Sequence, residues 1–288
     1  MLLESVEYVR AQSIDEALRE LSANDGAAVL AGGQSLLNVL KNRVASVEVL
    51  VDISELAELR TIERGADGSL EIGACVTYDE LDRSADVREG HAVLAEVAGH
   101  IEDQQIRSRG TIGGNCCLGD PTNNLPPLLI ALGATMNIQG TSGVRSVAAE
   151  DFFFAFFSTA VAQGEILRSI TVPPIPSGAG VGYQSLAVGA DSKAIVRASA
   201  YVRANGTVED ARVVLSIVGP RPIRHAGMEQ RLRGGALSAD AVAAASEAIG
   251  DDIEPVGDSH GSADYRRRMA RVLARRAVNE AIERGAAR

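Results

Sequence analysis

Residues Ala27-Ala-Val-Leu-Ala-Gly-Gly-Gln-Ser-Leu36 place two glycines directly after an apolar strand candidate and directly before a predicted helix. Paired glycines allow the backbone to adopt positive φ and to expose successive amide N–H groups that can bind an anion. A helix that begins just beyond them adds the positive end of its dipole. This stretch therefore predicts an α/β unit whose strand-to-helix turn can hold a phosphate.

A second glycine pair lies in Thr111-Ile-Gly-Gly-Asn115, with Asp120-Pro121 behind it. Both pairs are flanked by short hydroxyl or amide side chains, which suit hydrogen bonds to phosphate or ribose oxygens. A ligand with two linked phosphates, held between two loops, is one interpretation. The other is that each glycine pair only makes a tight turn between a strand and a helix.

Outward from the first glycine pair, the chain predicts a small β-α-β-α-β unit. Ser13 and Glu16 have capping-box spacing, and apolar residues follow at helical intervals through Leu21. Strand candidates lie near 6–9 and 27–31, and Val47 to Ile53 alternate as a third strand.

Beyond residue 57 the pattern changes to short alternating segments separated by helices. The expected strands are 70–72, 134–139, 165–172, 182–187, 194–203 and 211–218, with Val213, Leu215 and Ile217 on one face of the last. The expected helices are 78–83, 91–101, one capped by Ser238 through Ile249, and a terminal one around 264–273. Prolines and glycines at 173–180 predict a linker.

These segments predict an α+β protein of two domains. A first domain of residues 1–175, with subdomains of about 1–57 and 58–175, combines the small β-α-β unit with a mixed or antiparallel sheet and helices. Residues 176–288 form a C-terminal domain of antiparallel sheet and helical bundle.

Composition excludes several classes of protein. The 288 residues are 46% hydrophobic and 23% charged, which excludes wholesale disorder, and the net charge of −10 argues against a nucleic-acid-binding protein. The sequence holds no run of 18 apolar residues and no recognisable signal peptide, so we expect a cytoplasmic protein. Three cysteines are too few for a disulfide framework.

Spacing excludes several nucleotide-binding and catalytic motifs. Neither glycine pair has the G-x-G-x-x-G pattern, and neither lysine follows a glycine as a P-loop requires. Gly33-Gln-Ser35 resembles the start of a nucleophile elbow, but position 37 is Leu. The four histidines are scattered without metal-ligand spacing, so we expect no metal site.

The two glycine motifs together resemble the FAD-diphosphate motifs of one family, the flavoprotein (medium) subunits of molybdenum hydroxylases. This family includes carbon monoxide dehydrogenase, xanthine dehydrogenase and bacterial N-heteroaromatic hydroxylases. The resemblance covers nearly the whole chain, because Val49-Leu-Val-Asp-Ile53, Val218-Gly-Pro-Arg-Pro-Ile-Arg224 and Asp264-Tyr-Arg-Arg-Arg-Met269 are similar to later family segments in the same order.

The resemblance implies an FAD-carrying electron-transfer subunit without catalytic residues of its own. Electrons from a molybdopterin-type molybdenum cofactor in a large subunit would pass through two [2Fe–2S] clusters in a small subunit to the flavin, and then to an external acceptor. The assembly would be a dimer of heterotrimers. The implied FAD-binding residues are Ala31, Gly32, Gly33, Gln34, Ser35, Leu36, Thr111, Ile112, Gly113, Gly114, Asn115, Asp120, Asn124 and Lys193.

Some positions depart from the family pattern. Asn124 stands where a second acidic residue is common, and Lys193 where an aromatic residue often covers one face of the isoalloxazine. Lys193 could pair with a reduced flavin anion, or could be a solvated loop lysine. Cys116 and Cys117 could be redox-active near the flavin, although we favour buried small side chains. Arg107 and Arg109 could pair with the diphosphate, or could be solvated.

Three functions stay open at this point. The leading one is the FAD subunit of a molybdenum hydroxylase acting on an N-heteroaromatic compound, because Gln34 stands where carbon monoxide dehydrogenases tend to carry His. A carbon monoxide dehydrogenase medium subunit is the alternative within this first function. The second function is a free-standing flavin oxidase or dehydrogenase. The third is a flavin-free binding or scaffolding protein whose glycine turns are structural.

Overall fold

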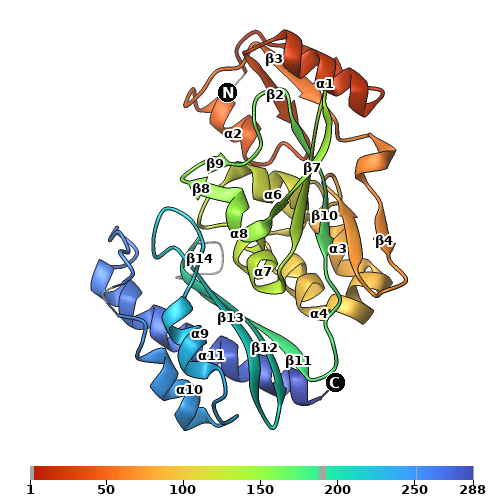
Figure 1. The fold of residues 1–288 in the computed structure, drawn as a ribbon. Helices are drawn as coiled ribbons and strands as arrows, with labels where there is room; N and C mark the ends of the chain where they lie inside the picture. The colour runs from red at the N-terminus through yellow and green to blue at the C-terminus, as the bar shows by residue number, and fades with distance from the viewer. Residues whose placement is uncertain (1–2, 188–192, 251, 288) are drawn as a thin grey trace.

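The computed structural model describes residues 3–187, 193–250 and 252–287. The expected domains, 1–175 and 176–288, also include residues 1–2, 188–192, 251 and 288, which lie outside the described residues. The described strands form a three-stranded parallel sheet, five-stranded and four-stranded antiparallel sheets, and a two-stranded hairpin. This arrangement of sheets and helices confirms the predicted α+β class (Figure 1).

The N-terminal unit is the predicted β-α-β-α-β fold. Its elements are β1 (Glu7–Arg10), α1 (Ile14–Ala23), β2 (Ala27–Leu30), α2 (Leu36–Lys41) and β3 (Val49–Asp52), with strand order β1-β3-β2. Ser13 caps α1 by accepting a hydrogen bond from the Glu16 amide at 3.1 Å. The Glu16 carboxylate accepts from the Gln12 amide at 2.7 Å, so the expected capping box is only half formed.

The middle of the chain builds the five-stranded sheet and the helices that cover it. The sheet has the order β4-β5-β10-β6-β7, formed by Ile62–Arg64, Leu70–Gly73, Ile166–Val172, Thr135–Gly140 and Gly143–Ala148. A 3₁₀ turn, Ala57–Leu59, precedes β4. The helices are α3 (Tyr78–Arg83), α4 (Ala85–Gly99), α5 (Gln104–Arg107), α6 (Ile112–Leu118), α7 (Leu125–Leu132) and α8 (Ala149–Phe152). A short hairpin, β8 (Phe153–Ala155) and β9 (Ser158–Thr159), follows α8.

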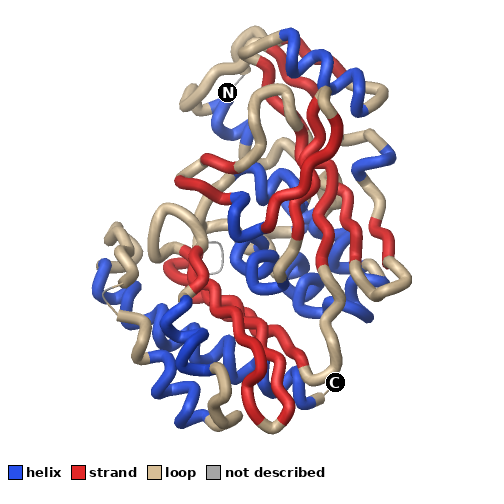
Figure 2. Tube along the Cα trace, in the orientation of Figure 1, coloured by secondary structure: helices blue, strands red, loops and turns tan. Residues whose placement is uncertain are grey.

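Helix α7 joins the middle of the chain to the C-terminal sheet. All eight of its residues are buried, and it contacts both β12 (Ala194–Asn205) and β13 (Thr207–Ser216). Because α7 packs on one face of this sheet and helices cover the other, the central strands are buried on both faces (Figure 2).

The C-terminal region completes the sheet in the order β11-β12-β13-β14, with β11 at Ala179–Ala187 and β14 at Ile223–Arg224. Helices α9 (Ala226–Leu232), α10 (Ala239–Ser246) and α11 (Ala263–Ala286) follow. Helix α11 contacts β11 and β12. The prediction that β13 extends to residue 218 is wrong, because Ile217 has a left-handed φ of 67° that ends the ladder at Ser216.

No helix of the described residues is long and apolar enough to cross a membrane.

Candidate functional site

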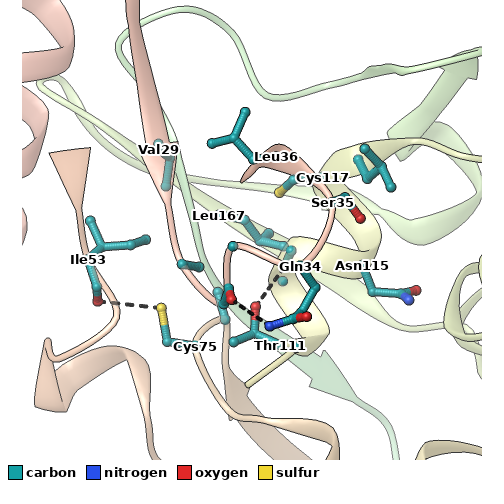
Figure 3. A pocket seen from close by; sticks show the side chains of 18 of the residues that line it. Val29, Gln34, Ser35, Leu36, Ile53, Cys75, Thr111, Asn115, Cys117 and Leu167 are labelled. Carbon is teal, nitrogen blue, oxygen red and sulfur yellow. Dashed lines mark hydrogen bonds between the residues drawn. The ribbon is translucent and has the colours of Figure 1, made fainter. Parts of the chain in front are cut away.

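Both glycine motifs line one cavity of about 520 Å³ between the N-terminal unit and the five-stranded sheet region. All six residues of Ala31–Leu36 contribute to its wall, together with Thr111, Gly113, Gly114 and Asn115. Figure 3 shows Gln34, Ser35 and Leu36 from the first motif beside Thr111 and Asn115 from the second. Segments about 80 positions apart in the sequence therefore line a single cavity.

The first motif offers unused hydrogen-bond donors. Gly33 has a φ of 71°, a left-handed conformation that glycine adopts without steric cost. Within the described part of the chain, the amide N–H groups of Gly33, Gln34 and Ser35 have no hydrogen-bond acceptor. Three successive free amides beside a cavity are the donor set that a phosphate group requires.

Gly32 explains why the first motif needs two glycines. A Cβ atom built on Gly32 would lie 2.1 Å from the carbonyl oxygen of Arg109, so the backbones of the two motif regions pack directly against each other. Gly32 therefore serves close packing, whereas Gly33 serves backbone conformation.

The second motif differs from the expected glycine turn. Gly113 and Gly114 lie in the first turn of α6, and neither has positive φ. The amide of Gly113 donates to the carbonyl of Ala74 at 2.9 Å, and that of Gly114 donates to Thr111 Oγ1 at 3.1 Å. The prediction of a second anion-binding nest is wrong, because these donors are already used within the protein.

Asn115 gives the second motif a free acceptor instead. Its Nδ2 donates to the Tyr78 hydroxyl at 3.0 Å, whereas its Oδ1 is buried without a hydrogen-bond partner among the described residues. Burial raises the pKa of Tyr78, so its hydroxyl stays neutral and can accept this bond at physiological pH. An orphaned buried oxygen at a cavity wall indicates a donor supplied by a ligand.

The cavity is almost free of charge. Of the described residues that line it, only Glu165 carries a formal charge, and Arg145 pairs with this carboxylate at 2.6 Å. Arg107 and Arg109 do not line the cavity, and Arg107 donates to the carbonyls of Ile101 and Glu102. Neutral donors, rather than arginines, face the space where an anion would lie.

Four of the predicted site residues lie outside the wall of this cavity, namely Ile112, Asp120, Asn124 and Lys193. Ile112 is fully buried in the core. Asn124 is the residue before α7 and lies near Tyr183, whose raised pKa reflects mainly burial, moderated by Arg197 and Asn124.

Lys193 forms an ion pair with Asp120, at 2.8 Å between Nζ and Oδ2. The Asp120 Oδ1 atom also accepts hydrogen bonds from the amide and hydroxyl of Thr122 at 2.8 and 2.6 Å. Burial alone would raise the pKa of Asp120, but the bonds from Lys193 and Thr122 outweigh it and hold the pKa below its usual value. The Lys193 ammonium therefore has a carboxylate partner within the protein.

The three cysteines are free, and they are buried or partly buried. Cys116 is fully buried, while Cys75 and Cys117 line the cavity. Burial raises the pKa of Cys75 and of Cys117 to about 12, so both are thiols at physiological pH. Among the described residues, no three His, Cys, Asp or Glu side chains are grouped where they could hold a metal ion.

Several wall residues were not anticipated from the sequence. They are apolar or aromatic side chains from β2, from the residues that follow β3 and β5, from the segments on either side of β9, and from β10, including Val29, Ile53, Tyr78, Phe157, Val161 and Leu167. The position of Ile53 directly after β3 could have indicated that it lines the site. Nothing in the local sequence distinguishes the others from ordinary core residues, because their role depends on the packing of distant segments.

The chain is similar to known proteins over nearly its whole length. Residues 4–175 match the family model described as the FAD binding domain in molybdopterin dehydrogenase, and residues 182–281 match the CO dehydrogenase flavoprotein C-terminal domain. The chain is 37% identical to the carbon monoxide dehydrogenase medium chain of Hydrogenophaga pseudoflava over 96% of each chain. It is 32% identical to the nicotine 6-hydroxylase medium subunit of Paenarthrobacter nicotinovorans, over 98% of this chain and 99% of that one.

A solved structure has the same fold. The chain matches the carbon monoxide dehydrogenase structure from Hydrogenophaga pseudoflava with a TM-score of 0.95 and 36% identity, over 99% of both chains.

Proposed function

The chain belongs to the family of FAD-binding medium subunits of molybdenum hydroxylases, which makes it an FAD-containing oxidoreductase subunit, and we propose that its FAD lies in the cavity formed by the two glycine motifs. The observation that carries this placement is the row of three unused amides at Gly33, Gln34 and Ser35. These amides would bind the diphosphate, and Asn115 Oδ1 would accept a hydrogen bond from a sugar or ribityl hydroxyl.

The residues present fit this cofactor. A diphosphate needs several donors, a sugar hydroxyl needs an acceptor, and planar rings need apolar walls, and the cavity supplies each of these. FAD supplies the redox chemistry when bound, so the protein needs only to bind, orient and shield it. Gly32 keeps the two binding segments together, since its missing side chain leaves room for the Arg109 carbonyl.

The remaining predicted site residues would act from the edge of the site. Asp120 and Lys193 connect the loop after α6 to the start of β12, and Asn124 lies in the same loop. We propose that this loop supports the flavin end of the cofactor, and that the Asp120–Lys193 pair positions the loop instead of contacting the flavin directly.

We further propose that electrons reach this FAD from [2Fe–2S] clusters of a small subunit, which takes them from the molybdenum cofactor of a large subunit. Support comes from the names of the relatives, which are medium chains or subunits, and from the chain's three cysteines, too few to hold a four-thiolate cluster. The assembly would be a dimer of heterotrimers. Its cytoplasmic location stays a prediction.

For the substrate of the complex we propose an N-heteroaromatic compound. Gln34 and the similarity to a nicotine 6-hydroxylase subunit support this proposal. Carbon monoxide is the second candidate, because the similarity to a carbon monoxide dehydrogenase medium chain is higher. Anaerobic addition of quinoline or nicotine to the native complex is expected to bleach its visible absorption, and bleaching by carbon monoxide alone would reverse the assignment.

The test of the whole proposal is purification of the untagged protein from its native host, followed by its visible spectrum and by mass and metal analysis. FAD with two further subunits, iron and molybdenum is the expected result. A lone yellow protein that oxidises a substrate by itself would support a free-standing flavoenzyme instead. A lone colourless protein would contradict the placement of FAD in the cavity.

A further inference from the structure

One exposed aromatic side chain lies at the wall of the cavity. All five phenylalanines of the chain fall within 152–157, around the β8–β9 hairpin. Phe152 and Phe153 are buried and pack edge to face with ring centroids 5.0 Å apart. Phe157 lines the cavity although 66% of its surface is exposed. Its aromatic ring therefore has a free face beside the proposed FAD site.

The backbone of Phe157 is held in a costly conformation. Its φ of 53° lies in the left-handed region, which a bulky residue rarely adopts. The Phe157 amide donates to the Gly119 carbonyl at 3.0 Å, and a Cβ atom on Gly119 would lie 3.2 Å from Phe157 Cα. The hairpin is thus locked against the loop after α6. Strained residues of this kind concentrate at ligand-binding sites.

Two other side chains that could contact a planar ring already have partners within the protein. Tyr78 also lines the cavity, but it is 6% exposed, its hydroxyl bonds to Asn115, and its ring packs against Gly110. Lys193 was also expected to contact the flavin, yet its ammonium pairs with Asp120. Among the described aromatic residues of the cavity wall, Phe157 is the one with an exposed ring.

We propose that Phe157 stacks on a planar ring of bound FAD. A second apolar side chain of the wall, Val44, is 75% exposed and can cover the cofactor from the N-terminal unit. Burying both exposed side chains against the cofactor removes apolar surface from water, and the aromatic contact adds stacking energy. This inference rests on the proposed position of FAD. The isoalloxazine and adenine share the required chemistry.

The test uses the full-length chain, freed of flavin and titrated with FAD and FMN by flavin fluorescence. Phe157→Ala is expected to weaken FAD binding on the order of tenfold, as stacked bases lose when an aromatic partner is removed. The affinity of Phe157→Leu for FAD should lie between those of the wild type and of Phe157→Ala. Phe154→Ala is the matched control, since Phe154 is 57% exposed in the same hairpin but lies outside the cavity wall. It should bind FAD as the wild type does.

Binding of FMN identifies the ring that Phe157 contacts, because FMN contains the isoalloxazine but lacks the adenine. Equal weakening of FMN and FAD by Phe157→Ala would place Phe157 on the isoalloxazine, and weakening of FAD alone would place it on the adenine. Phe157→Gly, which removes the backbone cost, should melt at a higher temperature than the wild type without flavin and still bind FAD poorly. If Phe157→Ala binds FAD as tightly as Phe154→Ala, the inference is wrong, whereas a wild type that binds no FAD would overturn the proposed site as well.

Discussion

The ammonium nitrogen of Lys193 lies 2.8 Å from Oδ2 of Asp120, which ties the start of β12 to the loop that follows α6. The two residues are far apart in the sequence, and each was expected to contact the cofactor. Their pairing links the C-terminal sheet to this loop. Arg197, also on β12, donates to the carbonyl of Thr122 and strengthens the same connection.

Replacing Lys193 by Met should lower stability at neutral pH and much less in acid. The pKa of Asp120 is depressed in the folded protein, so its contribution is present above the ordinary carboxyl pKa of about 3.9 and is lost as the pH falls through the folded value. Lys193 is 68% exposed, so the loss is at most about 1 kcal/mol, or about 2 °C in melting temperature.

Thermal melts of the wild type and Lys193→Met at pH 7 and below pH 4 measure this difference. Lys41→Met is the control, because Lys41 makes no ion pair with the described residues. A difference that stays constant across this pH range would contradict the role of the Asp120 pair.

Gly32→Ala should separate the two glycine motifs. The new methyl group would lie 2.1 Å from the Arg109 carbonyl, and because this obstacle is backbone, one of the two segments must move. Such overpacking costs about 1–3 kcal/mol. We expect a lower melting temperature and a lower FAD content per chain, read from the ratio of visible to ultraviolet absorption. Gly219→Ala meets no atom within 4 Å and should leave both unchanged.

Asn115→Asp tests the proposed path of the diphosphate. The substitution keeps the shape of a side chain that is 7% exposed but adds a negative charge beside the cofactor. We expect FAD affinity to fall on the order of tenfold at pH 8, and to recover partly at pH 5.5 as the carboxyl protonates. Tyr78→Phe removes the hydrogen bond to Asn115 without adding charge, and its effect should be smaller. Equal effects of the two variants would argue against a nearby phosphate.

The thiols should resist alkylation in the folded protein. With the pKa of Cys75 and Cys117 raised to about 12 by burial, the reactive thiolate is scarce at pH 8. Iodoacetamide at this pH, followed by mass spectrometry, should label neither cysteine within the time that labels an unfolded sample completely. Rapid labelling of Cys117 in the folded protein would show that the cavity exposes a reactive thiol.

The sequence predicted the elements in which apolar residues recur at regular intervals. The helix over Tyr78–Arg83 has the predicted bounds, and the β-α-β-α-β unit follows from apolar periodicity and from the glycines after β2. Helix α7 was missed, because two prolines lie in its first turn and it is buried on every side, so its sequence carries no periodic pattern. The left-handed Ile217 was also missed, since nothing in a β-branched residue signals positive φ.

The sequence predicted the first glycine motif as an anion-binding segment, and its free amides agree with this prediction, because local residues determine backbone conformation. Only the tertiary structure decided the conformation of the second motif. There α6 forms, and the amides of Gly113 and Gly114 donate to acceptors within the protein. It also decided that Lys193 pairs with Asp120, and that Phe157 lies beside the cavity. These relationships join segments distant in the chain, and no local pattern specifies which distant groups will meet when the core packs.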